Sequence, residues 1–213
     1  MRVEKITTAT AKDLLTRGNA DLLRTAAVGI VGSRKASLKG VGAAQDCAGQ
    51  LARLGVTVVS GYANGIDLAS HKAALDAGGA TILVLAEGIE RFRLKREIEA
   101  AWDWERALVV SEYPPNAAWS VKQAMQRNGT ICELSRAVIV AEAQRNSGTM
   151  NTVRLCLKMK LPLFVVTYEN MEDLAGGNAL AIEMGGRPLY KGRISQRAKI
   201  DPICDLLQVE QKT

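Results

Sequence analysis

The stretch that decides the fold is AVGIVGSRKAS, residues 27–37. Its first five residues are apolar or glycine, without polar alternation, which is typical of a parallel strand covered on both faces. A glycine and a polar loop follow, and residues 40–54 then have the composition of a helix. A buried strand that turns through such a loop into a helix is the first half of a βαβ unit.

The same unit recurs along the chain. Short β-branched runs predict strands at 27–31, 56–60, 80–85, 108–111, 137–140 and 163–167, with helices at 40–54, 66–77, 91–106, 121–134, 150–159 and 171–183. About six βα repeats predict an α/β fold with a Rossmann-like, doubly wound, mainly parallel sheet in a three-layer α/β/α arrangement. We expect one domain over residues 1–213 with its core at 27–190, a short polar helix in the first 25 residues, and a final strand and basic tail in the last 25.

Composition narrows the class of protein. The 28 Lys and Arg exceed the 22 Asp and Glu, and the formal charge of +6 favours anionic partners slightly. No apolar run approaches the roughly 20 residues that span a bilayer, and the N-terminus lacks the apolar core of a secretory signal. The four cysteines are far apart and form no CxxC pair, which fits a reducing cytosol. We therefore expect a cytoplasmic protein with no membrane partner, no metal and no cofactor.

The chemistry is expected at one edge of the sheet. In open α/β sheets, ligands bind beyond the carboxyl ends of the strands, and glycines, hydroxyls and charged side chains gather at those ends here. The loops in question are 32–37, 60–67, 86–88, 111–116 and 141–149. The candidates for binding phosphate or nucleic acid are Gly32, Ser33, Arg34, Lys35, Ser60, Gly61, Asn64, Gly65, Asp67, Arg127, Asn128, Ser147, Gly148 and Thr149.

Two of these loops have the features of an anion site. Gly32 lets backbone approach a ligand, the N–H groups before the next helix attract an anion, and the guanidinium of Arg34 suits a phosphate. Ser147, Gly148 and Thr149 open a later helix in the same way. The spacing around Gly32 does not match the GxGxxG fingerprint, so dinucleotide binding by that motif is not supported.

The only histidine, His71, lies four residues after Asp67 on the same face of a predicted helix. We expect a structural role, in which the ring orients Asp67 or a neighbouring backbone group. A general base would need a nucleophile or water within reach, and the sequence offers neither. We assign no catalytic residue.

The residues also carry a resemblance. SGYANGIDLASH at 60–71 resembles the signature of the DNA-processing protein A family (DprA, also called Smf). Further matching pieces follow the family's order: AVGIVGSRKAS at 27–37, LARLGVTVVSG at 51–61, GGATILVLAEGIE at 78–90, LVVSEYPP at 108–115, QRNGTICELSRAVIVAEAQRNSGT at 126–149 and LPLFVV at 161–166. The resemblance implies a Rossmann-like core that binds single-stranded DNA in DNA uptake or recombination, a RecA-type recombinase as partner, and a homodimer.

The chain departs from the family pattern at two positions. Asn64 stands where the family usually has an arginine, and Gly129 replaces the second arginine of an R-N-R motif. The segment at 186–199 has five basic residues and no acidic one, so it could supply some of the lost charge.

A second class of function stays open, namely a nucleotide sensor or a nucleotide-processing enzyme on the same fold. The LONELY GUY phosphoribohydrolases resemble this chain near Ser147, but Thr152 stands where they have a glutamate. Cleavage of an N-glycosidic bond needs a carboxylate beside the forming oxocarbenium ion, for which only Glu87, Glu112 and Glu142 remain.

Aromatic and apolar segments give two further expectations. Trp119 follows a loop at the ligand edge and could stack on a base, whereas Trp102 is expected in the core. The apolar segment at 161–166 and the turn after it are candidate surroundings for a dimer interface, although the segment could instead be a buried strand.

Overall fold

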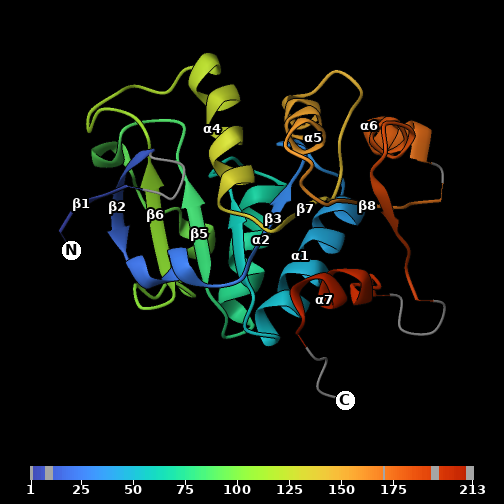
Figure 1. Cartoon of the computed structure of the whole chain (residues 1–213), viewed down its shortest axis with the longest axis horizontal. Coiled ribbons are helices and arrows are strands. Elements are labelled where there is room, and N and C mark those ends of the chain that lie inside the picture. Colours follow the sequence, from blue (N-terminus) through green and yellow to red (C-terminus); the bar gives the residue numbers. More distant parts are fainter. Residues whose placement is uncertain (1, 8–11, 170, 193–196, 210–213) are drawn as a thin grey trace.

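The computed structural model describes residues 2–7, 12–169, 171–192 and 197–209, with the side chains of 171–174 excluded. In these residues nine strands form one sheet in the order β1-β2-β6-β5-β4-β3-β7-β8-β9 (Figure 1). The strands are β1 Glu4–Thr7, β2 Asp13–Gly18, β3 Ala27–Val31, β4 Thr57–Ser60, β5 Thr81–Val84, β6 Ala107–Ser111, β7 Ala137–Val140, β8 Leu163–Val166 and β9 Arg187–Leu189. From β6 to β9 every neighbouring pair is parallel, which confirms the predicted doubly wound sheet.

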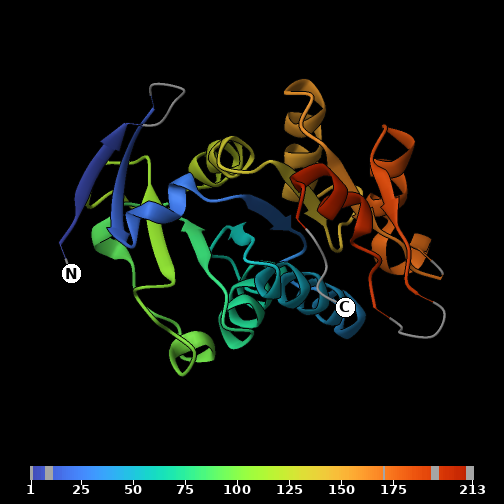
Figure 2. The same ribbon diagram turned by 60° about the horizontal axis from the view of Figure 1, so that its bottom comes forward.

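Helices cover both faces of this sheet, as Figure 2 shows. They are α1 Leu38–Arg53, α2 Ile66–Asp76, α3 Arg96–Glu99, α4 Val121–Glu133, α5 Gly148–Lys158, α6 Met171–Glu183 and α7 Asp201–Leu207, with 3-10 turns η1 Ala20–Arg24 and η2 Ile89–Arg91. Successive strand residues point to opposite faces. Val28 and Ile30 therefore pack beneath α1, α2 and α7, whereas Val31 and Val138 pack beneath α4, α5 and α6. Burial on both faces explains why the strands are almost wholly apolar.

The order of the strands creates a switch point between β3 and β7. The chain proceeds from β3 through β4 and β5 to β6 on one side, and then returns to place β7 on the other side of β3. Ile30 lies opposite Ile139 in this pair. The loops that leave β3 and β7 therefore diverge, and the crevice between them is where a ligand fits in such folds.

The prediction of a helix in the first 25 residues is wrong. The segment forms the antiparallel hairpin β1–β2, which extends the sheet beyond β6, and only the 3-10 turn η1 follows. In β2 the side chains of Leu14 and Thr16 are buried and alternate with more exposed neighbours, so this short stretch has the period of a strand.

The prediction of one helix over 91–106 is also wrong. Only α3 and η2 are helical there, because Phe92, Trp102 and Trp104 fold back into an aromatic cluster with Tyr62. Ring centroids lie 5.0–6.2 Å apart in this cluster, and its burial outweighs the helical propensity of the segment. Trp102 packs against the core, as expected.

The C-terminal segment is a strand followed by a helix rather than a strand and a tail. β9 pairs with β8, and α7 then packs Ile203, Cys204 and Leu207 against the core beneath α1. Arg197 of the basic segment 186–199 pairs with Asp46 of α1 at 3.0 Å, and Arg193 lies outside the described residues. The described helices include none with both the length and the apolar character that crossing a bilayer requires.

Candidate functional site

A pocket of about 460 Å³ lies at the switch point between β3 and β7. Its walls are the loops that follow these two strands and the facing sides of α4 and α5. Ten of the residues singled out from the sequence line it: Gly32, Ser33, Arg34, Lys35, Asp67, Arg127, Asn128, Ser147, Gly148 and Thr149. The structure thus brings together residues up to 117 positions apart in the chain. We call this pocket the switch-point pocket.

Backbone contacts fix the first loop of this pocket. The N–H of Ser33 donates to Glu142 O at 2.8 Å, and the N–H of Ile66 donates to Ser33 O at 3.2 Å. Gly65 makes this packing possible, because its φ is +76° and an added Cβ would lie 2.3 Å from Ser33 O. The anchored loop leaves the side chains of Arg34 and Lys35 exposed at the mouth.

The N-terminus of α5 is open toward the pocket. Ser37 caps α1 through Gly40 N at 3.0 Å, and Ser120 caps α4 through Gln123 N at 3.2 Å. Ser147 at the start of α5 instead donates its hydroxyl to Gln144 O at 2.8 Å. The first N–H groups of α5 have no side-chain cap, and they carry the positive end of the helix dipole. Such an end binds an anion.

A buried ion pair forms the floor of the pocket. Arg127 Nη1 lies 3.8 Å from Asp67 Oδ2, and these side chains are 8% and 9% exposed. Burial raises the pKa of Asp67, although the guanidinium of Arg127 opposes the rise; burial likewise lowers the pKa of Arg127. Among the described residues Arg127 Nε finds no hydrogen-bond partner. Nε is thus an unsatisfied buried donor, and the positive charge of the guanidinium favours an anion in the pocket that Arg127 lines.

Three sequence candidates line neither pocket described here: Ser60, Gly61 and Gly65. Ser60 is fully buried, and its hydroxyl donates to Ile30 O at 2.5 Å. This side chain therefore has a structural role and does not reach a phosphate in the pocket, contrary to the prediction from the sequence. Gly61 leaves room for the ion pair, since a Cβ there would overlap the guanidinium of Arg127. Gly65 holds two loops together, as described above.

His71 has the structural role that its position predicted. It is fully buried, with Nε2 2.5 Å from Gly61 O and Nδ1 2.6 Å from Thr81 Oγ1. Burial lowers the pKa of His71 to about 4, so the ring is neutral at pH 7 and its Nε2–H donates to the carbonyl. The ring therefore orients a backbone group of the loop at 60–65, the second of the two roles expected for it.

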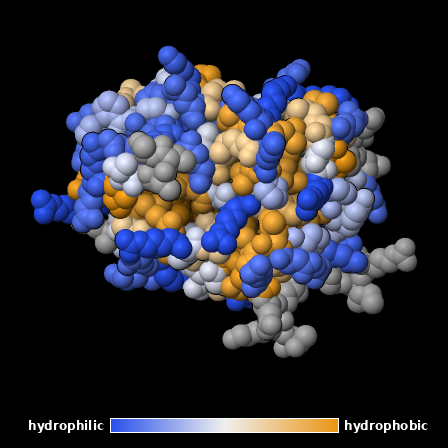
Figure 3. Space-filling model, viewed as in Figure 1, coloured by the Kyte–Doolittle hydropathy of each residue, from blue (hydrophilic) through white to orange (hydrophobic). Residues whose placement is uncertain are grey.

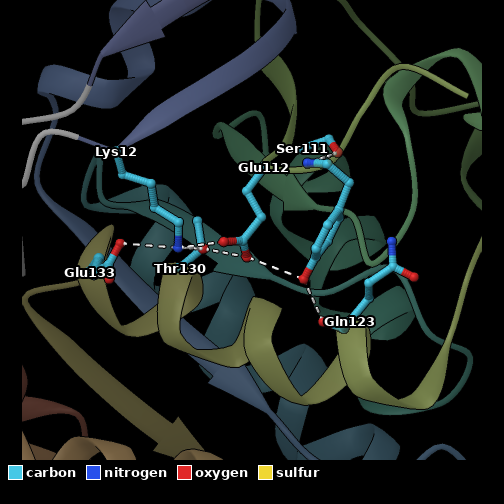
Figure 4. A network of polar contacts seen from close by, with 7 residues as sticks. Lys12, Ser111, Glu112, Gln123, Thr130 and Glu133 are labelled. Carbon is cyan, nitrogen blue, oxygen red and sulfur yellow. Dashed lines mark hydrogen bonds and ion pairs between the residues drawn. The ribbon is translucent and has the colours of Figure 1, made fainter. Parts of the chain in front are cut away.

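Two of the three carboxylates considered for catalysis are engaged within the protein. Glu142 is 4% exposed and accepts hydrogen bonds from the N–H and hydroxyl of Ser37, which secures the start of α1. Glu112 contacts Lys12 at 2.7 Å and accepts from Thr130 at 2.9 Å in the network of Figure 4. The same Lys12 lies 3.5 Å from Glu133, so the network attaches the N-terminal hairpin to α4. Thr152, where a glutamate would be needed, is 1% exposed.

A second pocket of about 360 Å³ adjoins the first, and we call it the side pocket. Asn64 lines it, and Arg34, Lys35 and Arg127 line both pockets. Trp119, the stacking candidate, also lines it, with Arg34 Cζ 5.5 Å from its ring centroid.

Sequence reasoning missed the apolar residues at the mouth. Val121 and Met125 line the switch-point pocket and are 67% and 37% exposed. Their i, i+4 spacing on a helix that begins beside the ligand edge could have indicated them. Figure 3 shows one face of the molecule, on which apolar surface is interleaved with hydrophilic side chains. At the mouth of the switch-point pocket, Val121 and Met125 adjoin Arg34 and Lys35, so bases and phosphates can both be accommodated there.

Comparison with known sequences supports the resemblance. A sequence model described as DNA recombination-mediator protein A matches residues 2–194. DNA processing protein DprA of Streptococcus pneumoniae is 34% identical over 182 residues, and DprA of Bacillus subtilis is 30% identical over 179 residues. These alignments cover 84% and 83% of this chain but only 64% and 60% of the two relatives. The chain thus spans less than two thirds of their length.

Solved structures give the same fold. The structure of DprA from Streptococcus pneumoniae matches with a TM-score of 0.76 at 32% identity, over 86% of this chain and 65% of that one. DNA processing protein A from Helicobacter pylori, described for its single-stranded DNA binding mode, matches with a TM-score of 0.77 at 24% identity, over 88% and 91%. A molybdenum cofactor carrier protein from Chlamydomonas reinhardtii matches at 0.59 with 19% identity, so the fold extends to other ligands.

Proposed function

Because the chain belongs to the DNA recombination-mediator protein A family, we propose that it binds single-stranded DNA along the carboxyl edge of its sheet. The observation that carries this proposal is the composition of the switch-point pocket. Arg34, Lys35, Arg127 and the uncapped start of α5 surround it, whereas Asp67, already paired with Arg127, is the acidic residue in its lining. These groups favour phosphate.

The shape of the site favours a strand over a single nucleotide. The two pockets share Arg34 and Arg127, and exposed Val121 lines the first pocket while exposed Trp119 lines the second. A strand can place successive phosphates near the cations and its bases against the apolar residues. A mononucleotide would satisfy only part of this surface.

Thermal unfolding with two ligands tests the proposal. A ligand that binds only the folded state raises the melting temperature, so an unstructured oligonucleotide should raise it clearly and a panel of mononucleotides should shift it little. A strong shift with a mononucleotide and none with the oligonucleotide would instead support the sensor or enzyme class.

Arg34→Ala supplies the matched variant. Arg34 is exposed, so the fold should stay intact, while the loss of a charge-assisted phosphate contact should weaken oligonucleotide binding by about 1–2 kcal/mol. Arg24→Ala is the control, since Arg24 is exposed and lies in η1, just before the amino end of β3. Equal affinities for the two variants would contradict the role given to Arg34.

The phosphoribohydrolase alternative is less favoured. Glu142 and Glu112 are engaged with Ser37 and Lys12, and Thr152 supplies no carboxylate. Glu87, the third carboxylate, lines the side pocket and not the switch-point pocket that Thr152 lines. No second function is proposed.

The partners implied by the family extend the proposal. We propose a homodimer and a RecA-type recombinase as partner, because the family match covers most of the chain. Strand β8, within the apolar segment at 161–166, does not form the interface, since it is an interior strand and Leu163–Val166 are at most 3% exposed. A monomer mass by light scattering across a wide concentration range would contradict the dimer.

A further inference from the structure

The side pocket has the walls of a site for a flat ring. Trp119 is 47% exposed, and the guanidinium of Arg34 lies 5.5 Å from its ring centroid. Tyr62 also lines this pocket, with Lys95 Nζ 4.5 Å from its ring centroid. Aromatic faces and guanidinium planes are the surfaces on which nucleobases stack.

The loops that carry this pocket are fixed relative to each other. Gly88 N donates to Ala117 O at 2.8 Å, and Glu90 N donates to Pro115 O at 2.9 Å. Gly88 allows the close approach, because an added Cβ would lie 2.2 Å from Pro115 O. The loop that bears Glu87 and the loop that bears Trp119 therefore form one anchored unit.

Two polar side chains in the lining have hydrogen-bonding capacity for a ligand. Glu87 is half-buried, and within the described part of the chain its carboxylate makes no hydrogen bond or ion pair. Asn64 Oδ1 accepts from Lys95 Nζ at 2.9 Å, which assigns the amide orientation and leaves its NH₂ group as a donor. The lining thus offers a carboxylate acceptor and an amide donor.

Among the four DNA bases, guanine matches these groups best. Its Watson–Crick edge has two neighbouring donors, N1–H and N2–H, which can both reach one carboxylate, and the acceptor O6 beside them. Cytosine and adenine each present one amino group to a carboxylate. Thymine has a single N3–H between two carbonyl oxygens, which a carboxylate repels.

We infer that the side pocket receives one base of the bound strand and that Glu87, with Asn64, selects guanine there over thymine. The inference rests on the proposed function, because it assumes that the phosphates of a strand lie at the adjoining cations. It concerns one base position, so binding across the rest of the strand stays insensitive to sequence.

The test compares three 12-nucleotide single strands: all thymine, the same strand with guanine at every third position, and the same strand with hypoxanthine in place of guanine. Isolated guanines avoid self-association of the strand, and hypoxanthine removes only the N2 amino group. The wild-type protein should bind the guanine strand about fivefold more tightly than the thymine strand, as expected for a two-bond contact in a partly exposed pocket. The hypoxanthine strand should lose most of that gain.

Glu87→Gln should bring the guanine-to-thymine affinity ratio close to one, even if the lost negative charge tightens binding of every strand. Glu99→Gln, an exposed carboxylate in α3, removes the same charge and should keep the wild-type ratio. A wild-type ratio near one, or an unchanged ratio in Glu87→Gln, would overturn the inference while leaving the proposed function intact. Failure of all strands to bind would overturn both.

Discussion

Arg127 shows how one residue can serve both the fold and the ligand. Its guanidinium is buried against Asp67 and Gly61, yet it lines both pockets. A buried charge that loses its partner is costly, by about 3–5 kcal/mol when one member of such a pair is removed. Arg127 therefore differs from exposed Arg34, although both were candidates for the same contact.

We predict that Arg127→Met lowers the free energy of unfolding by about 3 kcal/mol or more, because it leaves the carboxylate of Asp67 buried without its cation. The double variant Arg127→Met with Asp67→Asn should recover part of this loss, as expected for residues in contact. Chemical denaturation of the three proteins measures both effects. Additive losses in the double variant would show that the two side chains do not interact.

His71 gives a second residue-scale prediction, concerning pH. Its pKa in the folded protein is about 4, against an ordinary value of 6.5, so the unfolded chain takes up the proton first as the pH falls. The contribution of His71 to stability is complete above about pH 6.5 and is lost progressively toward pH 4, by about 3 kcal/mol in all. His71→Gln should be less stable at pH 7 and less dependent on pH in this window. Denaturation at several pH values compares the slopes, and equal slopes would contradict a buried neutral ring.

At the scale of elements, α4 depends on the N-terminal hairpin. Lys12 Nζ lies 2.7 Å from Glu112 and 3.5 Å from Glu133, and it donates to Thr130 Oγ1 at 2.5 Å. The three charged side chains are only 15–27% exposed. Tyr113 adds a bond from its hydroxyl to Gln123 O at 2.7 Å, near the start of α4. The helix that carries Arg127 and Asn128 is thus held at both ends.

We predict that Lys12→Met destabilises the protein by about 1–3 kcal/mol, because two carboxylates lose their shared cation. This range lies between the stability losses typical of exposed and of buried ion pairs. Lys5→Met is the control: the Lys5–Asp13 pair has the same 2.7 Å separation, but its side chains are 63% and 52% exposed. Lys5→Met should change the melting temperature little. Equal shifts for the two variants would mean that burial of the Lys12 network does not matter.

The elements also show what the sequence could and could not predict. Six of the seven parallel strands, and the sheet edge that carries the loops, followed from apolar runs and from the rule for open sheets, because burial on both faces leaves a clear pattern. The hairpin β1–β2 and the aromatic fold of 91–106 did not follow. Their conformation depends on partners far along the chain, namely β6 and Tyr62, and local propensity contains no information about those contacts.

The site was predictable to a similar extent. Loop position placed ten candidates in one pocket, since carboxyl ends of parallel strands meet at one edge. It could not distinguish exposed Arg34 from buried Arg127, or show that the hydroxyl of Ser60 faces Ile30 O. It also missed Val121 and Met125, because helix rotation relative to the sheet is set by packing on the opposite face.

At the scale of the whole molecule, the distribution of charge matters more than its total. The formal charge of +6 is modest, and some of the cations, such as Arg197 and Lys72, are neutralised by Asp46 and Asp76 away from the two pockets. Arg34, Lys35 and Arg127 are gathered at the carboxyl edge instead. Binding of an anionic strand should therefore depend on a few local cations rather than on the net charge.

We predict that single-stranded DNA binds with little overall sequence preference and with a marked dependence on salt. Each phosphate neutralised on a single strand contributes a slope of about −0.7 to the logarithm of the binding constant against that of salt concentration. Contacts to the two or three cations of the pockets give an expected slope between about −1.4 and −2.1. Arg34→Ala should make the slope shallower by about 0.7, whereas Arg24→Ala, at the far edge, should leave it unchanged. Fluorescence anisotropy with a labelled thymine strand between low and moderate salt measures these slopes. Affinity that does not change over this range would mean that stacking of bases on Trp119 and their apolar contact with Val121, not phosphate binding, hold the strand.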